Sequence, residues 1–425
     1  PPLYTYQDAI DSLVLFERVQ YDETIQIDQN IRVRFKDAGH MLGSSIIELW
    51  ITEDGKEKKI VFTGDLGNND IPLLREPTMI DDADILIMES TYGDRLHEKK
   101  EDKAAEFLKT VSETLERGGN VVIPSFAVGR TQEILYELNT LKDVQEGEDF
   151  KKKYATIMSA PVYVDSPLAT SATEVFLKNL DCLDEFVQED IKDGIKPLDF
   201  PGLRFTQSVE ESKLLNETAN RSIIISASGM CEVGRIKHHL KHNLWRPEST
   251  ILFVGYQAIG TLGRKIVDGA KTVKIFGEEI GVNAQVKYIE AFSGHADQNG
   301  LLKFVESFKK RPMQIYLVHG DEEAQNVLAG KIGEEFNIPV DIPMRGDVYE
   351  VSDYRINKVG ELKSPNEYKF IRLELLQKLE NLRDELDDMT TYLNADLKKE
   401  TTDEEIAKKM ERLSELEKQI VEVIK

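Results

Sequence analysis

The chain of 425 residues contains only two cysteines, Cys182 and Cys231. Two thiols cannot form a disulfide framework or a cysteine-rich zinc site, and so few cysteines are typical of a reducing compartment, which predicts a cytoplasmic protein. The sequence also lacks any run of eighteen or more apolar residues, which excludes a transmembrane helix. Its first residues, PPLYTYQDAI, contain neither the basic nor the apolar segment of a secretory signal peptide.

Positive charge is also scarce, since 54 Lys and Arg residues stand against 77 Asp and Glu residues, for a net charge of −23 at pH 7. Proteins that bind nucleic acid along a broad surface usually carry a basic footprint. The excess of negative charge therefore disfavours binding along a broad surface of nucleic acid or membrane. RNA binding would require a local groove of positive charge. The length allows two or three domains.

Up to about residue 355 the chain alternates short apolar segments with helical ones, which predicts an α/β protein. Several apolar segments are continuous runs of Val, Ile and Leu, as expected of strands that are buried on both faces. Helices are expected over residues 131–141 and 299–308. Strands are expected over residues 31–35, 44–51, 59–65, 84–89, 120–126, 160–166, 222–228, 250–256 and 315–320.

Small polar residues recur where these strands end, in TGDLG, MESTYGD, PSFAVGR, VDSPLA, SASGM, FSGHAD and LVHGD. In open α/β sheets, ligands bind beyond the carboxyl ends of the strands. The recurrence therefore predicts one large site that is assembled from distant segments of the chain.

Three of the seven histidines, His40, His295 and His319, lie at such strand ends among small residues. Asp65 and Glu89 occupy equivalent positions in FTGDLG and MESTYGD. Neutral imidazole and carboxylate are the usual ligands of catalytic zinc, and a pair of metal ions can stabilise the attacking and leaving oxygens of a phosphodiester. The constellation predicts a metal-dependent hydrolase.

The other histidines favour a different interpretation. His238 and His242 are four residues apart on an expected helix, a spacing that can bind zinc, but the glutamate of a zinc-protease helix is absent between them. For these two, and for His97 and His239, packing or substrate contact is the favoured interpretation and metal binding is the alternative.

Glycine-rich turns are a second group of candidate site residues. SASGMCEVGR and GYQAIGTLGR each follow an expected strand and end in arginine. Successive backbone N–H groups in such turns can bind anions, and arginine adds bidentate phosphate contacts. Together with PSFAVGR, these turns predict phosphate-binding groups at Arg130, Arg235 and Arg264. Near the same strand ends, Phe126, Tyr256 and Phe292 either belong to the core or stack on bases.

The chain changes character from about residue 367, where charged residues accompany leucines spaced alternately by four and three. Thr402 and Glu405 are spaced as a capping box that opens a second helix. The pattern predicts an antiparallel helical hairpin over residues 367–425. This hairpin either packs on its own domain or pairs with a second copy to form a homodimer.

The segments DAGHMLGS, FTGDLG, ESTYGDR, PSFAVGRTQE, DSPLATSATE, GYQAIGTLGR, FSGHAD and LVHGDE resemble the signature segments of the β-CASP family. These are zinc-dependent nucleases of the metallo-β-lactamase fold, which include ribonuclease J and the pre-mRNA 3′-end endonuclease. The resemblance runs from about residue 2 to about residue 350 and is greatest to the bacterial and archaeal single-chain ribonucleases. It implies a zinc-dependent ribonuclease that acts on single-stranded RNA in RNA processing or degradation.

The resemblance also implies an architecture. A metallo-β-lactamase αββα sandwich would be formed by residues 1–90 and 286–355. The inserted α/β β-CASP lobe would span residues 91–285, and the helical hairpin of residues 367–425 lies outside the likeness.

Carried over position by position, His40 and His319 resemble zinc ligands, and Asp65 resembles the carboxylate that bridges two metal ions. His295 resembles the family's proposed general acid, and Glu89 resembles the carboxylate that orients it, as a hydrogen-bonded acid fixes an imidazole tautomer. Backbone positions near the phosphate correspond to Ser228, Gly229 and Gly294.

The sequence departs from the family in one respect, because the central motif His-x-His-x-Asp-His occurs nowhere in these 425 residues. We therefore expect the chain to be part of a longer protein in which that motif precedes residue 1. The complete site would hold two zinc ions, and the residues present here would bind zinc weakly by themselves. A non-catalytic RNA-binding or scaffold protein of the same family is the alternative.

Overall fold

The computed structural model describes residues 4–68, 73–97, 100–143, 154–289, 294–351 and 356–361. The chain divides into two units, one of residues 1–345 and 351–357 and one of residues 346–350 and 358–425. The predicted helical hairpin lies outside the described residues. Among the helices of the described ranges, none combines the length and apolar character needed to cross a membrane.

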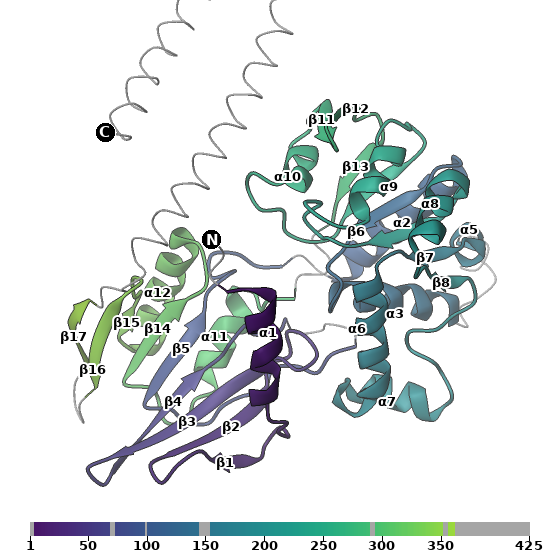
Figure 1. The fold of residues 1–425 in the computed structure, drawn as a ribbon. Coiled ribbons are helices and arrows are strands. Elements are labelled where there is room, and N and C mark those ends of the chain that lie inside the picture. Colours follow the sequence, from purple (N-terminus) through teal and green to yellow (C-terminus); the bar gives the residue numbers. More distant parts are fainter. Residues whose placement is uncertain are drawn as a thin grey trace, which may run out of the picture. The chain divides into compact units, whose positions relative to one another are not determined.

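The larger unit contains a seven-stranded sheet (Figure 1). Its strands are, in spatial order, β1 (Thr24–Gln26), β2 (Ile31–Asp37), β3 (Ser45–Glu53), β4 (Lys56–Phe62), β5 (Ile85–Glu89), β14 (Gln314–Val318) and β15 (Val340–Asp341). The first four strands are antiparallel, and β4, β5, β14 and β15 are parallel to one another. β5 and β14 are therefore neighbours in the sheet although more than half of the chain lies between them.

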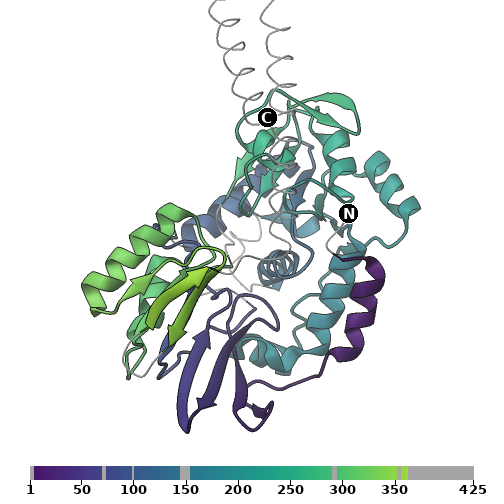
Figure 2. The same cartoon turned by 60° about the vertical axis from the view of Figure 1, so that its left-hand side comes forward.

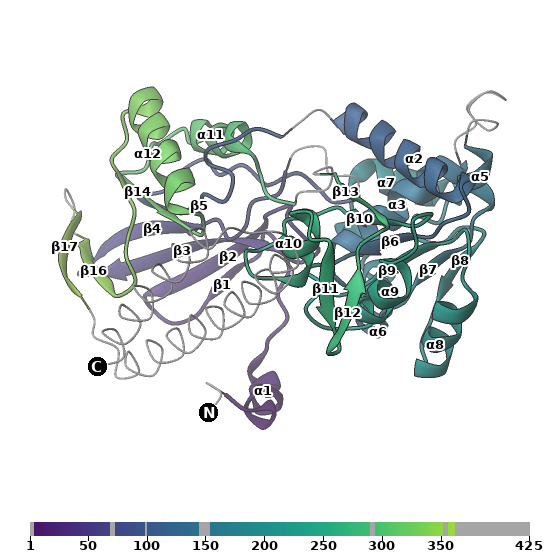
Figure 3. The ribbon, with the colours of Figure 1, turned by 90° about the horizontal axis from the view of Figure 1, so that it is seen from above.

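Two helices, α11 (Gln298–Glu306) and α12 (Glu322–Phe336), pack on one face of this sheet (Figure 3). Leu86 and Met88, two positions apart in β5, point to that face because side chains alternate along a strand. They share a core cluster with Phe304 of α11 and Leu328 of α12. In contrast, α1 (Tyr6–Ser12) and the 3₁₀ turn η1 (Leu13–Leu15), purple in Figure 2, contain no buried residue.

The second sheet of the larger unit has six strands. They are, in spatial order, β13 (Gln285–Tyr288), β10 (Thr250–Phe253), β6 (Val121–Pro124), β9 (Ile223–Ser226), β7 (Val162–Val164) and β8 (Leu203–Phe205). Every neighbouring pair is parallel, so all six carboxyl ends lie at one edge. The predicted boundary of the inserted lobe, residue 285, is the first residue of β13, and the division into domains stays a prediction.

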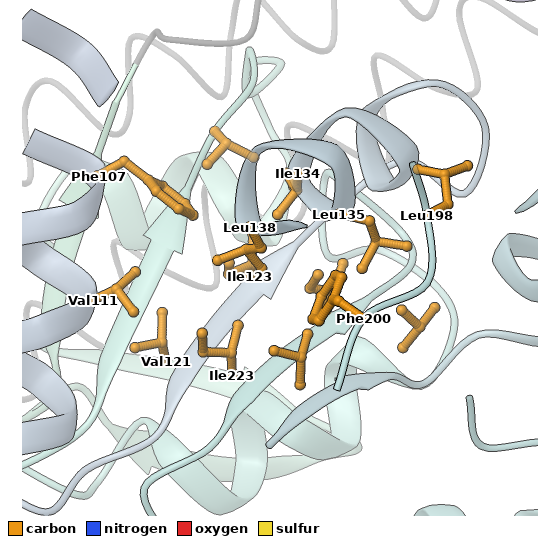
Figure 4. Packing of buried hydrophobic residues seen from close by; sticks show 14 of the residues in the cluster. Phe107, Val111, Val121, Ile123, Ile134, Leu135, Leu138, Leu198, Phe200 and Ile223 are labelled. Carbon is orange, nitrogen blue, oxygen red and sulfur yellow. The ribbon is translucent and has the colours of Figure 1, made fainter. Parts of the chain in front are cut away.

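Helices cover both faces of this sheet. They are α2 (Lys100–Glu116), α3 (Arg130–Asp143), α5 (Ala155–Ser159), α6 (Pro167–Lys178), the 3₁₀ turn η2 (Leu180–Cys182), α7 (Glu185–Lys192), α8 (Val209–Thr218), α9 (Ile236–Asn243) and α10 (Leu262–Val267). Val121 and Ile123 of β6 pack with residues of α2 and α3 (Figure 4), whereas Val122 between them packs with residues of α9 and α10. All three side chains are fully buried, which explains the continuous apolar runs of these strands.

Two small two-stranded sheets complete the described residues. One pairs β11 (Thr272–Ile275) with β12 (Glu278–Gly281). The other pairs β16 (Asp347–Val351) with β17 (Ile356–Glu361), and Lys358 forms a 2.6 Å ion pair with Asp347 in it.

The α/β prediction is confirmed, because all nine predicted strands are present and the two predicted helices correspond to α3 and α11. The structure adds eight strands that the sequence analysis did not predict. Four of them, β1, β8, β13 and β15, are edge strands of the large sheets, and the other four form the two-stranded sheets.

A buried charged cluster holds the carboxyl edge of the parallel sheet. The carboxylate of Asp165, after β7, is fully buried and accepts hydrogen bonds from Nε2 of His239 and Oγ of Ser212, each at 2.6 Å. Nη1 of Arg235 also lies 2.6 Å from it. Burial by itself raises the pKa of Asp165, but the hydrogen bonds from His239, Ser212 and Thr206 outweigh burial and hold the pKa well below its ordinary value.

We expect Asp165→Ala to lower the free energy of unfolding by about 3–5 kcal/mol, because it leaves buried donors and the Arg235 charge without their acceptor. The measurement is urea denaturation followed by circular dichroism at pH 7. Asp199→Ala, which removes a surface pair with Lys196, is the matched control and should cost less than about 1 kcal/mol. Equal losses in the two variants would contradict a stabilising role for the cluster.

Candidate metal and catalytic site

The predicted site residues of the first sheet meet at one edge. Glu89 is the last residue of β5, and His319 directly follows β14. Asp65 and His40 lie in the loops after β4 and β2, which run in the same direction as β5. Because the carboxyl ends of strands with one direction lie together, four residues that span most of the chain come close.

Two glycines allow the site loops to approach one another. A Cβ atom on Gly67 would lie 2.1 Å from the carbonyl oxygen of Gly39, and one on Gly294 would lie 2.9 Å from Cε1 of His40. The backbone N–H of Asn68 donates to the carbonyl of Gly294 at 3.0 Å. A side chain at Gly67 or Gly294 would therefore separate the loops that carry His40, Asp65 and His295.

Asp65 lies between two histidines. Its Oδ1 is 3.1 Å from Nδ1 of His319, and its Oδ2 is 3.8 Å from Nε2 of His40. Each carboxylate oxygen thus faces a different imidazole. Imidazole nitrogen and carboxylate oxygen are donors that zinc prefers, so the chemistry of these three side chains fits zinc.

Other combinations of potential ligands also occur here. His40, Asp65 and His295 have ligand atoms within 4.8 Å of one another, as do Glu89, His295 and His319. The side chain of Glu89, however, is only 1% exposed and already accepts from three donors. Glu89 is therefore better placed to hold its neighbours than to bind metal.

The Glu89 carboxylate joins three segments. Oε1 accepts a 2.6 Å hydrogen bond from the backbone N–H of Leu66 and lies 3.1 Å from Nδ1 of His295. Oε2 accepts from the backbone N–H of Thr91 at 3.3 Å. Because a carboxylate only accepts, Nδ1 of His295 carries the proton in this contact, which leaves Nε2 available for chemistry.

This contact sets the protonation of both partners. Burial by itself raises the pKa of Glu89, but the hydrogen bond and the charge of His295 outweigh it and lower the pKa. Burial lowers the pKa of His295, but the hydrogen bond to Glu89 outweighs it and raises the pKa. The pKa of His40 is lowered by burial and by the neighbouring His295, which favours the neutral form that binds metal.

His97, Thr63 and Thr91 support the site, and the sequence analysis gave none of them this role. Nε2 of His97 lies 3.0 Å from the carbonyl of His295, so it must carry a proton because a carbonyl only accepts. Thr63 Oγ1 accepts from the backbone N–H of Glu89 at 3.2 Å, and Thr91 Oγ1 is 3.2 Å from Nδ1 of His319. Their positions within the segments FTGD and ESTYGDRLH were the sequence feature that could have indicated this supporting role.

The predicted phosphate-binding backbone positions fall into two places. Gly294 contacts the ring of His40, as described above. Ser228 and Gly229 follow β9, where the hydroxyl of Ser228 donates to the carbonyl of Val233 at 3.1 Å. Gly229 lies against the ring of Phe126, since its Cβ would be 3.0 Å from a ring carbon. Phosphate binding at these positions stays a prediction.

Each of the three predicted arginines pairs with an acid. The distances are 2.5 Å for Arg130–Glu133, 2.6 Å for Arg235–Asp165 and 3.0 Å for Arg264–Asp268. Arg235 also donates to the backbone carbonyl of Gln207, so its observed partners are internal. Arg264 is the most exposed, with 40% of its side chain accessible. Phosphate binding by the three arginines stays a prediction.

The histidines of α9 are not part of the candidate site. His239 is fully buried against Asp165, which is the packing interpretation. His238 is exposed and its ring lies 4.5 Å from the ring of Phe276. No group of potential metal ligands in the described part of the chain includes His238, His239 or His242.

Two family models match the chain. The Beta-Casp domain matches residues 131–266, and the Zn-dependent metallo-hydrolase RNA specificity domain matches residues 279–343. The first match contains Ser228, Gly229, Arg235 and Arg264, and the second contains Gly294, His295 and His319.

Several known proteins are similar over most of the chain. Ribonuclease TTHA0252 of Thermus thermophilus is 35% identical over 322 residues, which cover 76% of this chain and 70% of that protein. The RNase J-like protein of Methanocaldococcus jannaschii is 34% identical over 351 residues, which cover 82% and 77%. Transcription termination factor FttA of the same organism is 34% identical over 358 residues, which cover 82% of this chain and 54% of that protein.

We expect Glu89→Gln to lower the pKa of His295, because the neutral amide removes the negative charge that stabilises the imidazolium. The measurement is an NMR titration of the histidine ring protons in metal-free protein. The pKa of the exposed His242 on α9 should be the same in both proteins and serves as the internal control. An unchanged pKa of His295 would show that Glu89 does not govern its protonation.

Proposed function

The chain belongs to the β-CASP family of metallo-β-lactamase-fold ribonucleases, and we propose that it hydrolyses phosphodiester bonds of single-stranded RNA with zinc. The observation that carries the proposal is the arrangement around Asp65. Its two oxygens face His40 and His319, while Glu89 holds His295 beside them.

Zinc would be held by His40, Asp65 and His319, and when bound it supplies activation of water and neutralisation of phosphate charge. Because Asp65 faces two separate histidines, we propose a site for two ions, which His40, Asp65 and His319 would share. Other ligands would come from outside these three residues, since three side chains shared between two ions leave most coordination positions open.

His295 would act as the general acid. Nδ1 is fixed by Glu89, so a proton on Nε2 can pass to the leaving oxygen as water attacks phosphorus and the bond between phosphorus and that oxygen breaks. The raised pKa of His295 keeps the imidazole protonated to higher pH than usual. Cleavage should therefore decline as the pH rises through this pKa, because the acid loses its proton.

The proposal is tested by measuring zinc content and RNA cleavage together in the full-length protein. We expect about two zinc ions per chain by elemental mass spectrometry and cleavage of labelled single-stranded RNA that a chelator abolishes and zinc restores. Asp65→Ala should lose both zinc and cleavage. His295→Ala should keep its zinc but cleave about 10²- to 10⁴-fold more slowly, because only the acid is removed.

Two results would redirect the proposal. RNA binding without chelator-sensitive cleavage would indicate a non-catalytic RNA-binding protein of the same family. Loss of zinc in His295→Ala would place His295 among the metal ligands, in the set that it forms with His40 and Asp65.

A further inference from the structure

Three half-exposed aromatic residues follow adjacent strands of the parallel sheet. Tyr288 is the last residue of β13, Tyr256 follows β10, and Phe126 follows β6. These strands are neighbours in the order β13-β10-β6 and are parallel. The three residues therefore lie along the same carboxyl edge, and we call them the aromatic row.

The exposure of the aromatic row contrasts with the residues around it. Tyr288, Tyr256 and Phe126 are 37%, 48% and 45% exposed. Ile289 and Ser125, which adjoin two of them in the chain, are buried. The row is thus accessible to solvent and is not part of the core.

The loops that carry the row are held in place by buried contacts. Gln257 is 4% exposed, and its Nε2 donates to the carbonyls of Gly229 and Tyr256 at 3.0 and 3.1 Å. A Cβ on Gly263 would lie 1.8 Å from Oε1 of Gln257, so glycine provides the space for this amide. With Gly229 packed against the ring of Phe126, the row is preorganised before any ligand binds.

The loop that follows Phe126 approaches the loop that carries His40. A Cβ on Gly129, in the loop after Phe126, would lie 3.9 Å from Cβ of Met41, which directly follows His40. Beyond Tyr288 the chain reaches His295 within a few residues. Two arginines follow the same strands, since Arg130 begins α3 after β6 and Arg264 lies in α10 after β10.

We propose that the aromatic row is a stacking platform for the unpaired bases of single-stranded RNA as the strand approaches the site. Every base has a π-face, so aromatic side chains bind a single strand without reading its sequence. In a chain of net charge −23, stacking adds affinity for a polyanion that overall electrostatics oppose. Arg264, whose side chain is 40% exposed, is the arginine that would contact a phosphate here, in exchange for Asp268. The inference rests on the proposed function, because it presumes an RNA substrate.

The test measures binding of fluorescent single-stranded RNA by anisotropy, with a chelator present so that no cleavage occurs. Each RNA is used intact and as a series with one abasic nucleotide at successive positions. Tyr256→Leu and Phe126→Leu keep apolar bulk but remove the ring. Phe186→Leu is the matched control, since Phe186 is a 78% exposed aromatic on α7, away from the row.

For wild type we expect abasic substitution at one or two positions to weaken binding about 5- to 100-fold, the range of base–aromatic stacking. Tyr256→Leu and Phe126→Leu should weaken binding of intact RNA by a similar factor and show no further loss on the abasic RNA. Phe186→Leu should bind every RNA as wild type does.

Two outcomes overturn the inference alone. The first is that wild type binds and cleaves RNA with no position sensitive to base removal, and the second is that the row variants lose the same factor on intact and on abasic RNA. Failure of wild type to bind any single-stranded RNA would overturn the proposed function as well. Circular dichroism spectra that match wild type establish that the variants are folded.

Discussion

The candidate site depends on one buried carboxylate. Glu89 ends β5 and receives hydrogen bonds from the loop after β4, from its own loop, and from His295, which lies 206 positions further along the chain. An ionised group that is 1% exposed is tolerated only because each oxygen is satisfied. The same contact that makes the buried charge acceptable therefore also fixes the imidazole that faces the metal ligands.

The two sheets carry different residues at their carboxyl edges. The mixed sheet carries the candidate ligands His40, Asp65 and His319 on loops that glycines bring together. The parallel sheet supplies glycine-rich turns and the aromatic row, and the Asp165 cluster braces the turns that follow β7 and β9. In both sheets the candidate site residues therefore lie in loops at the carboxyl ends of strands, within a protein of net charge −23.

The strands that the sequence predicted are the interior ones, and physical chemistry explains why. Interior strands of the parallel sheet are buried on both faces and are nearly all Val and Ile, as in 223–226. Edge strands such as β13, whose sequence is QVKY, retain polar residues because one of their sides is less covered by the rest of the protein. His40, Asp65, Glu89, His295 and His319 were predicted from their motifs, and their roles stay predictions. His97 and Thr91 contact the candidate site through a backbone carbonyl and a hydroxyl, which only the folded structure reveals.

The pairing of β5 with β14 has a consequence for how the protein is made. Ser90 bonds the carbonyl of Val318, 228 positions away, and the whole parallel sheet is encoded between them. At about 5–20 residues per second, a ribosome needs on the order of 10–50 s to bridge that interval. During this time β5 is a sheet edge without its partner. A parallel sheet that folds first would bring the ends of this long loop together and reduce the entropic cost of closing it. The order of synthesis thus favours completing the parallel sheet before β14 pairs with β5 and brings His319 to the candidate site.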